Sequence, residues 1–61
     1  MTAAGAEDRA QAELLFAEGR AADARGDYRR ARDCYRQSLA LHEDPAARAA
    51  LQSVLATLGP K

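Results

Sequence analysis

The residues of this chain that could take part in chemistry are one histidine, one cysteine and a cluster of arginines. His42 is followed by Glu43 and Asp44, and an imidazole beside two carboxylates suits a metal ion or an acid–base step. A metal would need a second nitrogen or sulfur ligand at a useful spacing, and the sequence supplies none. We therefore interpret His42 as a residue near the C-terminus of a helix, where positive charge is favourable.

Cys34 leads to a similar interpretation. A single cysteine forms neither an internal disulfide nor a metal cluster, and no base partner for a nucleophilic thiol is evident. We expect Cys34 to pack as a small hydrophobe beside Tyr35. The sequence therefore predicts no catalytic residue, no metal site and no cofactor, and we do not expect an enzyme.

Four arginines lie close together on the chain: Arg29, Arg30, Arg32 and Arg36. A nucleic-acid surface would place exposed aromatic side chains beside such a cluster, but Tyr28 and Tyr35 occupy positions expected to pack. Nine basic residues also balance nine acidic ones, so the formal net charge is zero, unlike that of a general nucleic-acid binder. We interpret the cluster as a solvated helix face on which Asp33 pairs with arginines one turn away.

The length and composition predict one small helical domain. The chain has 61 residues, and sixteen of its 29 apolar residues are alanine, with no isoleucine and no tryptophan. Alanine, arginine, leucine and glutamate favour helices, whereas the residues that favour strands are nearly absent. The first residues lack the apolar run of a signal peptide, and no stretch is apolar enough to span a membrane. We therefore expect a cytoplasmic protein that does not bind membranes.

Glycine and proline divide the chain into three expected helices, at about residues 4–25, 28–42 and 45–58. Gly26 can end the first helix in a left-handed conformation, and Asp27 can cap the second. Pro45 suits the first position of a third helix capped by Asp44, and Gly59-Pro60 is a common stop signal. The connections are short, so consecutive helices should be antiparallel neighbours.

Each expected helix has small or apolar residues spaced three and four apart, which mark a packing face. On the first helix they are Ala10, Leu14, Ala17, Ala21 and Ala24. On the second they are Tyr28, Ala31, Cys34, Tyr35, Ser38, Leu39 and Leu41. On the third they are Ala47, Leu51, Val54, Leu55 and Leu58.

The first two expected helices share a distinctive set of residues around their turn. The set comprises Leu15, Gly19, Ala22, the Gly26-Asp27-Tyr28 turn, Ala31, Tyr35, Ser38 and Leu39. This pattern resembles a tetratricopeptide repeat, a helix-turn-helix unit of about 34 residues. The resemblance covers roughly residues 13–45 and implies an all-α helical hairpin followed by a C-terminal capping helix. Gly19 and Ala31 would let the two helix backbones approach closely, with Tyr28 and Tyr35 filling the space beside them.

The resemblance also implies a function and a site. Members of the family are binding scaffolds that hold peptides or helices in a groove lined by the first helix of each pair. In this chain the partner-binding groove would comprise Glu13, Phe16, Arg20 and Asp23, faced by Arg48, Gln52 and Ala56 from the third helix. One subset of the family grips a C-terminal carboxylate with a Lys and an Asn four residues apart, but Phe16 and Arg20 occupy these positions here. Phe16 has two open interpretations, an interface anchor or a core residue.

We therefore expect a protein–protein interaction module that binds a peptide or helix of a partner protein, as an adaptor, assembly factor or co-chaperone. The alternative is a structural homo-oligomer. About three repeats are usually needed for a stable array, so a second copy, stacked across a two-fold axis, or a hetero-complex would add stability. Residues 1–18 carry four acids and one base, whereas residues 28–36 carry four bases and one acid, so opposite surfaces could attract each other.

Overall fold

A computed structural model describes the backbone of residues 2–59 and the side chains of residues 7–59. It contains α1 (Thr2–Ala24), α2 (Tyr28–Leu41) and α3 (Pro45–Leu58). The described residues form no strand, which confirms the all-α fold class. The helices begin and end within two residues of the positions indicated by the sequence. Pro60, part of the expected stop signal, lies outside the described residues.

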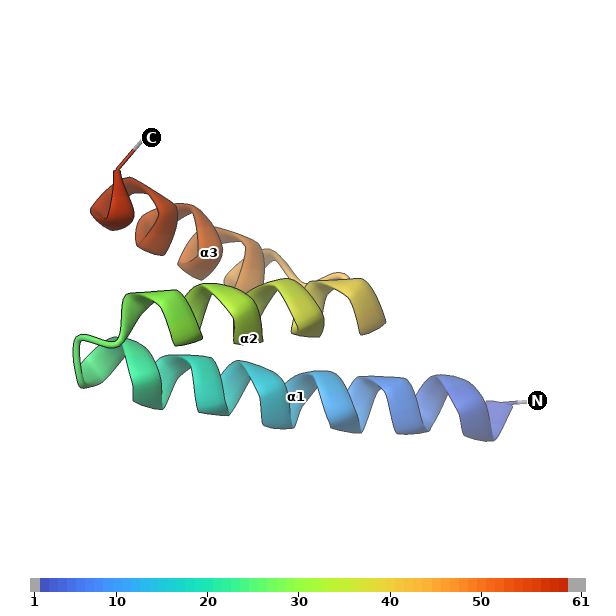
Figure 1. Cartoon of the computed structure of the whole chain (residues 1–61). Coiled ribbons are helices and arrows are strands. Elements are labelled where there is room, and N and C mark those ends of the chain that lie inside the picture. The colour runs from blue at the N-terminus through green and yellow to red at the C-terminus, as the bar shows by residue number, and fades with distance from the viewer. Residues whose placement is uncertain (1, 60–61) are drawn as a thin grey trace.

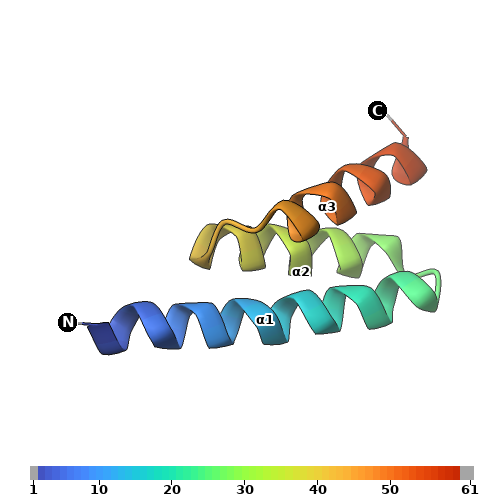
Figure 2. The same ribbon diagram turned by 180° about the vertical axis from the view of Figure 1, so that it is seen from behind.

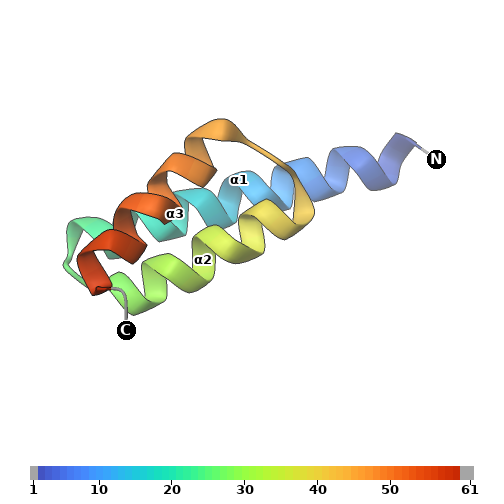
Figure 3. The same ribbon diagram turned by 90° about the horizontal axis from the view of Figure 1, so that it is seen from above.

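The three helices form a hairpin with a third helix laid on it. Helices α1 and α2 run antiparallel, and α3 rests against α2 with its C-terminal end directed away from the hairpin (Figures 1 and 2). Seen from above, α3 crosses the hairpin obliquely (Figure 3). The N-terminal turns of α1 project beyond the other helices (Figure 1), because α1 has 23 residues and α2 only 14. Helix α2 therefore lies between the other two helices and packs against both.

The residues at the helix ends explain why the chain turns where it does. Gly26 has a φ of 83°, which glycine adopts without the steric cost that a side chain would bring. The Asp27 carboxylate accepts a hydrogen bond from the backbone N–H of Arg30 at 3.4 Å, and that of Asp44 accepts one from Ala46 at 3.0 Å. Pro45 follows Asp44 at the start of α3, where its missing N–H costs nothing.

The packing face of α1 differs from the one that its alanine spacing predicts. The predicted residues Ala10, Leu14, Ala17, Ala21 and Ala24 are all exposed. The side that meets α2 instead carries Ala12, Leu15, Phe16, Gly19 and Ala22. In a helix so rich in alanine several faces satisfy a three–four spacing, so the spacing alone does not identify the buried one. The face is identified by Gly19, which gives Tyr35 room to enter.

The two helices of the hairpin pack tightly where Gly19 meets the side chains of Tyr35 and Cys34. A Cβ atom at Gly19 would lie 2.5 Å from Cε1 of Tyr35 and 3.2 Å from Cβ of Cys34. Tyr35 is fully buried, together with Ala22, Ala31 and Val54 in one core cluster. The expectation that Cys34 packs as a small hydrophobe is confirmed, because it is buried beside this contact.

Part of the predicted packing faces of α2 and α3 is exposed. Ala47 and Val54 of α3 are buried, and Leu51 is half-buried. Leu55 and Leu58, also predicted to pack, are 42% and 38% exposed. The reason is that α3 packs mainly on one neighbour, α2, so residues to the side of that contact face solvent.

Leu41, another predicted packing residue, is exposed at the end of α2. One turn earlier, Ser38 is buried, and its hydroxyl donates a 2.8 Å hydrogen bond to the carbonyl of Ala12. This bond satisfies a buried polar group, which would otherwise destabilise the fold. It also ties α2 to α1 near the open end of the hairpin.

Burial of Cys34 and Tyr35 predicts that stability falls at alkaline pH. Burial raises the pKa of the Cys34 thiol above its ordinary value of 9.0. Burial, with the Asp23 carboxylate nearby, raises the pKa of Tyr35 above 10.0. Above these ordinary values the unfolded chain binds fewer protons than the folded one, so stability decreases as pH rises. For Cys34 this contribution is fully present below pH 9.0 and is lost as pH rises through the raised pKa.

We expect the free energy of unfolding, measured in urea, to stay level up to about pH 9 and to fall as the pH rises above it. The Cys34→Ala variant should lose less stability over the same interval, because it lacks one of the two groups. An identical loss in the variant and the wild type would contradict a contribution from the thiol.

Candidate functional site

The side of α1 that borders α3 carries four residues spaced four, three and four apart: Arg9, Glu13, Phe16 and Arg20. We call this set the groove face. This spacing places the four side chains along one side of the helix. Arg9, Glu13 and Arg20 are exposed, and Phe16 is half-buried. The groove face therefore presents two cations and one anion around an aromatic ring.

Phe16 belongs both to the core and to the groove face. Its ring packs against that of Tyr35, with the centroids 5.7 Å apart and the planes tilted by 45°, an arrangement that aromatic pairs favour. The guanidinium carbon of Arg20 lies 5.7 Å from the Phe16 centroid, within the range of a cation–π contact. Among the described side chains Arg20 has no carboxylate within salt-bridge distance. Its donors are therefore free to bind an acceptor.

A small recess of about 80 Å³ opens at the N-terminal end of the groove face. Its lining residues are Arg9, Ala12, Glu13, Phe16, Ser38, His42 and Asp44. The Ser38 hydroxyl is engaged with Ala12, and the Asp44 carboxylate caps α3. The recess therefore has an aromatic wall and, at its rim, charged groups and an imidazole, with room for a few waters or one short side chain.

Asp23, the fourth predicted groove residue of α1, has a role inside the fold. It is half-buried, and its carboxylate accepts a 3.4 Å hydrogen bond from the Tyr35 hydroxyl. The contact places Asp23 at the edge of the core beyond Arg20. A ligand that used Asp23 would have to compete with Tyr35 for this carboxylate.

The residues predicted to face α1 from α3 lie elsewhere. Arg48 and Gln52 line a shallow depression formed only by residues 43–52, and α1 contributes nothing to it. Arg48 also pairs with Glu43. The structure thus brings Glu13, Phe16 and Arg20 together on α1, but it does not bring Arg48 and Gln52 into the same cavity. Ala56 is exposed on α3.

Two residues of this site, Arg9 and His42, were not predicted from the sequence as site residues. Arg9 lies one turn before Glu13, so extending the same helical face by one turn would have found it. His42, which we expected only near a helix end, does terminate α2 as its C-cap residue and also lines the recess. Its position there depends on how the α2–α3 connection folds back over α1, which no local sequence pattern indicates.

Comparison with known proteins agrees with this geometry. The tetratricopeptide repeat family model matches residues 12–45, more than half of the chain. The chain belongs to the tetratricopeptide repeat family. The matched segment comprises the C-terminal half of α1, all of α2 and the connection to α3, so the predicted resemblance is confirmed. No curated protein and no solved structure matches the chain.

Tetratricopeptide repeats generally mediate protein–protein interactions, so this repeat is a protein-interaction unit with protein partners. No helix within residues 2–59 is both long enough and apolar enough to cross a membrane. Across the side chains that the structure describes, no three histidine, cysteine, aspartate or glutamate residues gather to hold a metal ion. The charge cluster on α2 contains one ion pair, between Arg32 and its neighbour Asp33 at 3.1 Å, rather than the predicted pairs one turn apart.

Proposed function

We propose that this chain is a cytoplasmic adaptor, assembly factor or co-chaperone without a catalytic step, and that it binds a peptide segment of a partner protein along the groove face of α1. The observation that carries the proposal is the exposed Arg20 guanidinium held against the Phe16 ring. An arginine in this position offers a bidentate donor fork beside an apolar surface.

The chemistry of the groove face favours a particular kind of peptide. An apolar side chain would contact Phe16 while a carboxylate beside it binds Arg20, and the recess would receive a short neighbouring side chain. A carboxylate bound by arginine forms a charge-assisted hydrogen bond, which is stronger than a neutral one. Peptides that end in an apolar residue with a free C-terminus combine the two features.

This proposal predicts that short peptides with a C-terminal leucine or phenylalanine bind more tightly as free acids than as amides, by about tenfold. Calorimetric titration of both forms measures the difference. In the Arg20→Gln variant the difference should disappear, because an amide cannot form a charged pair. Arg25→Gln, at an exposed arginine just after α1, is the matched control and should keep the preference.

Equal binding of the acid and amide forms by the wild type would contradict the proposal, as would an Arg20→Gln variant that keeps the preference. Arg20→Gln is a sharper test than removing Phe16, because Phe16 also packs against the core. Circular dichroism of each variant checks that the helices remain folded.

The alternative function, a structural homo-oligomer, has a separate observation in its favour. Leu14, Leu55 and Leu58 are large apolar side chains exposed to solvent, and none of them belongs to the groove face. Leu55 and Leu58 lie one turn apart on α3, and contiguous exposed apolar surface often marks an interface.

A further inference from the structure

Two surfaces outside the groove face carry opposite charges, and each also exposes apolar side chains. The first, which we call the Leu14 face, is the side of α1 turned away from α2, with Ala10, Leu14, Ala17 and Ala21 flanked by Glu7 and Glu18. All six residues are exposed, and Leu14 is 62% exposed, the most among the large hydrophobic residues of the described part of the chain. The face is therefore an apolar stripe with an acidic border.

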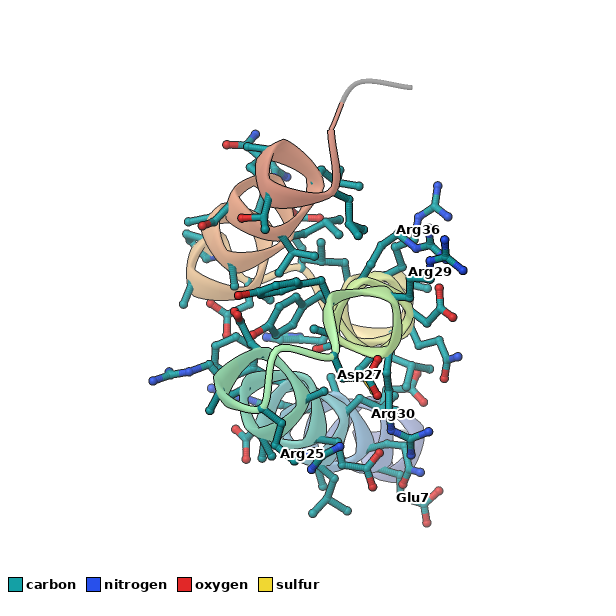
Figure 4. All side chains as sticks on the ribbon, turned by 60° about the vertical axis from the view of Figure 1, so that its left-hand side comes forward. Glu7, Arg25, Asp27, Arg29, Arg30 and Arg36 are labelled. Atoms are coloured by element: carbon teal, nitrogen blue, oxygen red, sulfur yellow. The ribbon has the colours of Figure 1, made fainter. Side chains whose placement is uncertain are left out.

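The second surface, which we call the α2–α3 outer face, combines leucines of α3 with arginines of α2. Its members are Leu51, Leu55 and Leu58, with Arg29, Arg32 and Arg36. Leu51 is half-buried, whereas Leu55 and Leu58 are exposed. Arg29 and Arg36 lie side by side on α2 and point away from α1 (Figure 4).

The helical positions place these leucines and arginines on the same side of the molecule. On α2, Cys34 and Ser38 turn toward α1 and fully buried Tyr35 lies at the centre of the packing. Arg32 and Arg36 lie farther round α2, past the contact with α3. On α3, Val54 faces the core, and Leu55 lies to one side of it. The side of α2 that carries these arginines and the side of α3 that carries Leu55 therefore face the same way.

We propose that the α2–α3 outer face binds the Leu14 face of a second copy of this chain. The leucines of the two surfaces would meet in the centre, and the arginines would lie opposite Glu7 and Glu18. The border of the Leu14 face carries two acids, and the α2–α3 outer face carries three arginines, one of which pairs with Asp33, so the two copies attract each other in this arrangement. Complementary charge of this kind sets the orientation and accelerates the encounter.

The other side of the hairpin is a poorer place for a second copy. A depression between α1 and α2, opposite α3, has Leu15 and Cys34 surrounded by charged residues such as Arg30 and Asp33. Its lining also includes Glu18 of the Leu14 face and Arg29 of the α2–α3 outer face. Covering these charges with a helix would remove them from water, a large cost unless each found a partner. Of the four large apolar side chains that are exposed within residues 7–59, three lie on these two surfaces: Leu14, Leu55 and Leu58.

The relative position of the two surfaces determines the symmetry of the assembly. Glu7 points below α1, on the opposite side of the molecule from Arg29 and Arg36 (Figure 4). One copy therefore uses its two surfaces on two different neighbours, which is a head-to-tail contact. Such contacts build chains or rings, whereas the two-fold dimer expected from the sequence would bring identical surfaces together. This inference uses surfaces other than the peptide groove, so the two proposals can fail separately.

Sedimentation of the full chain over a wide concentration range tests the proposal. The average mass of the wild type should rise with concentration and pass beyond that of a dimer. Leu14→Gln and Leu55→Gln should each weaken association by about tenfold or more, because each removes an exposed leucine from one of the two surfaces. Leu41→Gln is the matched control, since Leu41 is 37% exposed and belongs to neither surface, and it should associate like the wild type.

A mixture of the two weakened variants gives the decisive result. Leu14→Gln keeps an intact α2–α3 outer face, and Leu55→Gln keeps an intact Leu14 face. Mixed together they should form one-to-one pairs that do not grow further. A wild type that stays monomeric at every concentration would overturn the proposal, and so would a mixture that stays monomeric while the wild type associates.

Charge reversal separates this contact from general hydrophobic association. Arg36→Glu should weaken association, because it places an acid opposite the acidic border of the Leu14 face. Arg20→Glu makes the same change of charge on the groove face, outside both surfaces, and should leave association unchanged. Equal effects of the two reversals would overturn the proposed orientation. Circular dichroism confirms in each case that the variant is folded.

Discussion

Replacing Gly19 with leucine is expected to leave the chain largely unfolded. Even a Cβ atom at this position would lie 2.5 and 2.7 Å from two carbons of the Tyr35 ring, and the ring is fully buried, so it cannot move aside. Forcing extra atoms into a packed core costs about 1–3 kcal/mol or more. A domain of this size has only ~3–5 kcal/mol from its core. The cost and the total stability are therefore comparable.

Thermal melting followed by circular dichroism measures this effect. Gly19→Ala should lower the melting temperature by less than Gly19→Leu, because one methyl group displaces the ring less than an isobutyl group. Ala24→Leu makes a similar addition at an exposed position of the same helix and should change the melting temperature little. An unchanged melting temperature in Gly19→Leu would mean that the two helices do not meet at this residue.

Tyr35→Ala is the second substitution expected to have a large effect. Tyr35 is the largest fully buried side chain of the described residues, and it contacts Phe16, Gly19 and the core around Val54. Removing a buried aromatic ring costs about 3–5 kcal/mol, most of the stability that such a domain has. Urea unfolding should therefore show a transition shifted to very low denaturant or no folded baseline.

Tyr35→Phe is the control for the ring as distinct from the hydroxyl. It removes only the 3.4 Å hydrogen bond to Asp23, which contributes about 1 kcal/mol or less. If Tyr35→Phe destabilised as strongly as Tyr35→Ala, the hydrogen bond and not the packing would be the main contribution of this residue.

Combining the two large substitutions tests whether they act at the same contact. In the Gly19→Leu/Tyr35→Ala double variant the leucine would occupy part of the space that the ring leaves. Residues in direct contact show coupling in a double-mutant cycle, whereas distant ones add independently. The double variant should therefore be more stable than the sum of the two losses predicts.

The helices and their ends could be predicted from the sequence because their signals are local. Gly26 and Asp27 act within a few residues of their own positions, as do Asp44 and Pro45. The close contact at Gly19 was also predictable, since a glycine inside a helix is costly unless it permits something else. The family pattern located that contact correctly with Leu15, Gly19 and Ala22.

The faces of the helices were harder to predict, for a physical reason. Alanine is small enough to be buried or exposed at little cost, so the stripe through Ala10 and Leu14 looked like a packing face and is exposed. Leu55 was assigned to the core of α3 because it is apolar, but α3 has one main neighbour and cannot bury all of its apolar residues. The recess on α1 likewise depends on His42 and Asp44, which only the tertiary fold brings to it.

The central position of α2 has a consequence for how the molecule opens. Helix α2 packs against both other helices, whereas α1 and α3 meet mainly through the shared core around Tyr35. Detaching α3 breaks one interface and leaves the hairpin intact, but unfolding α2 breaks both. Local opening in proteins follows such differences in the number of interfaces lost. The amide protons of α3 should therefore exchange with solvent faster than those of α2. The third helix would open as a separate unit while the hairpin of α1 and α2 stays folded.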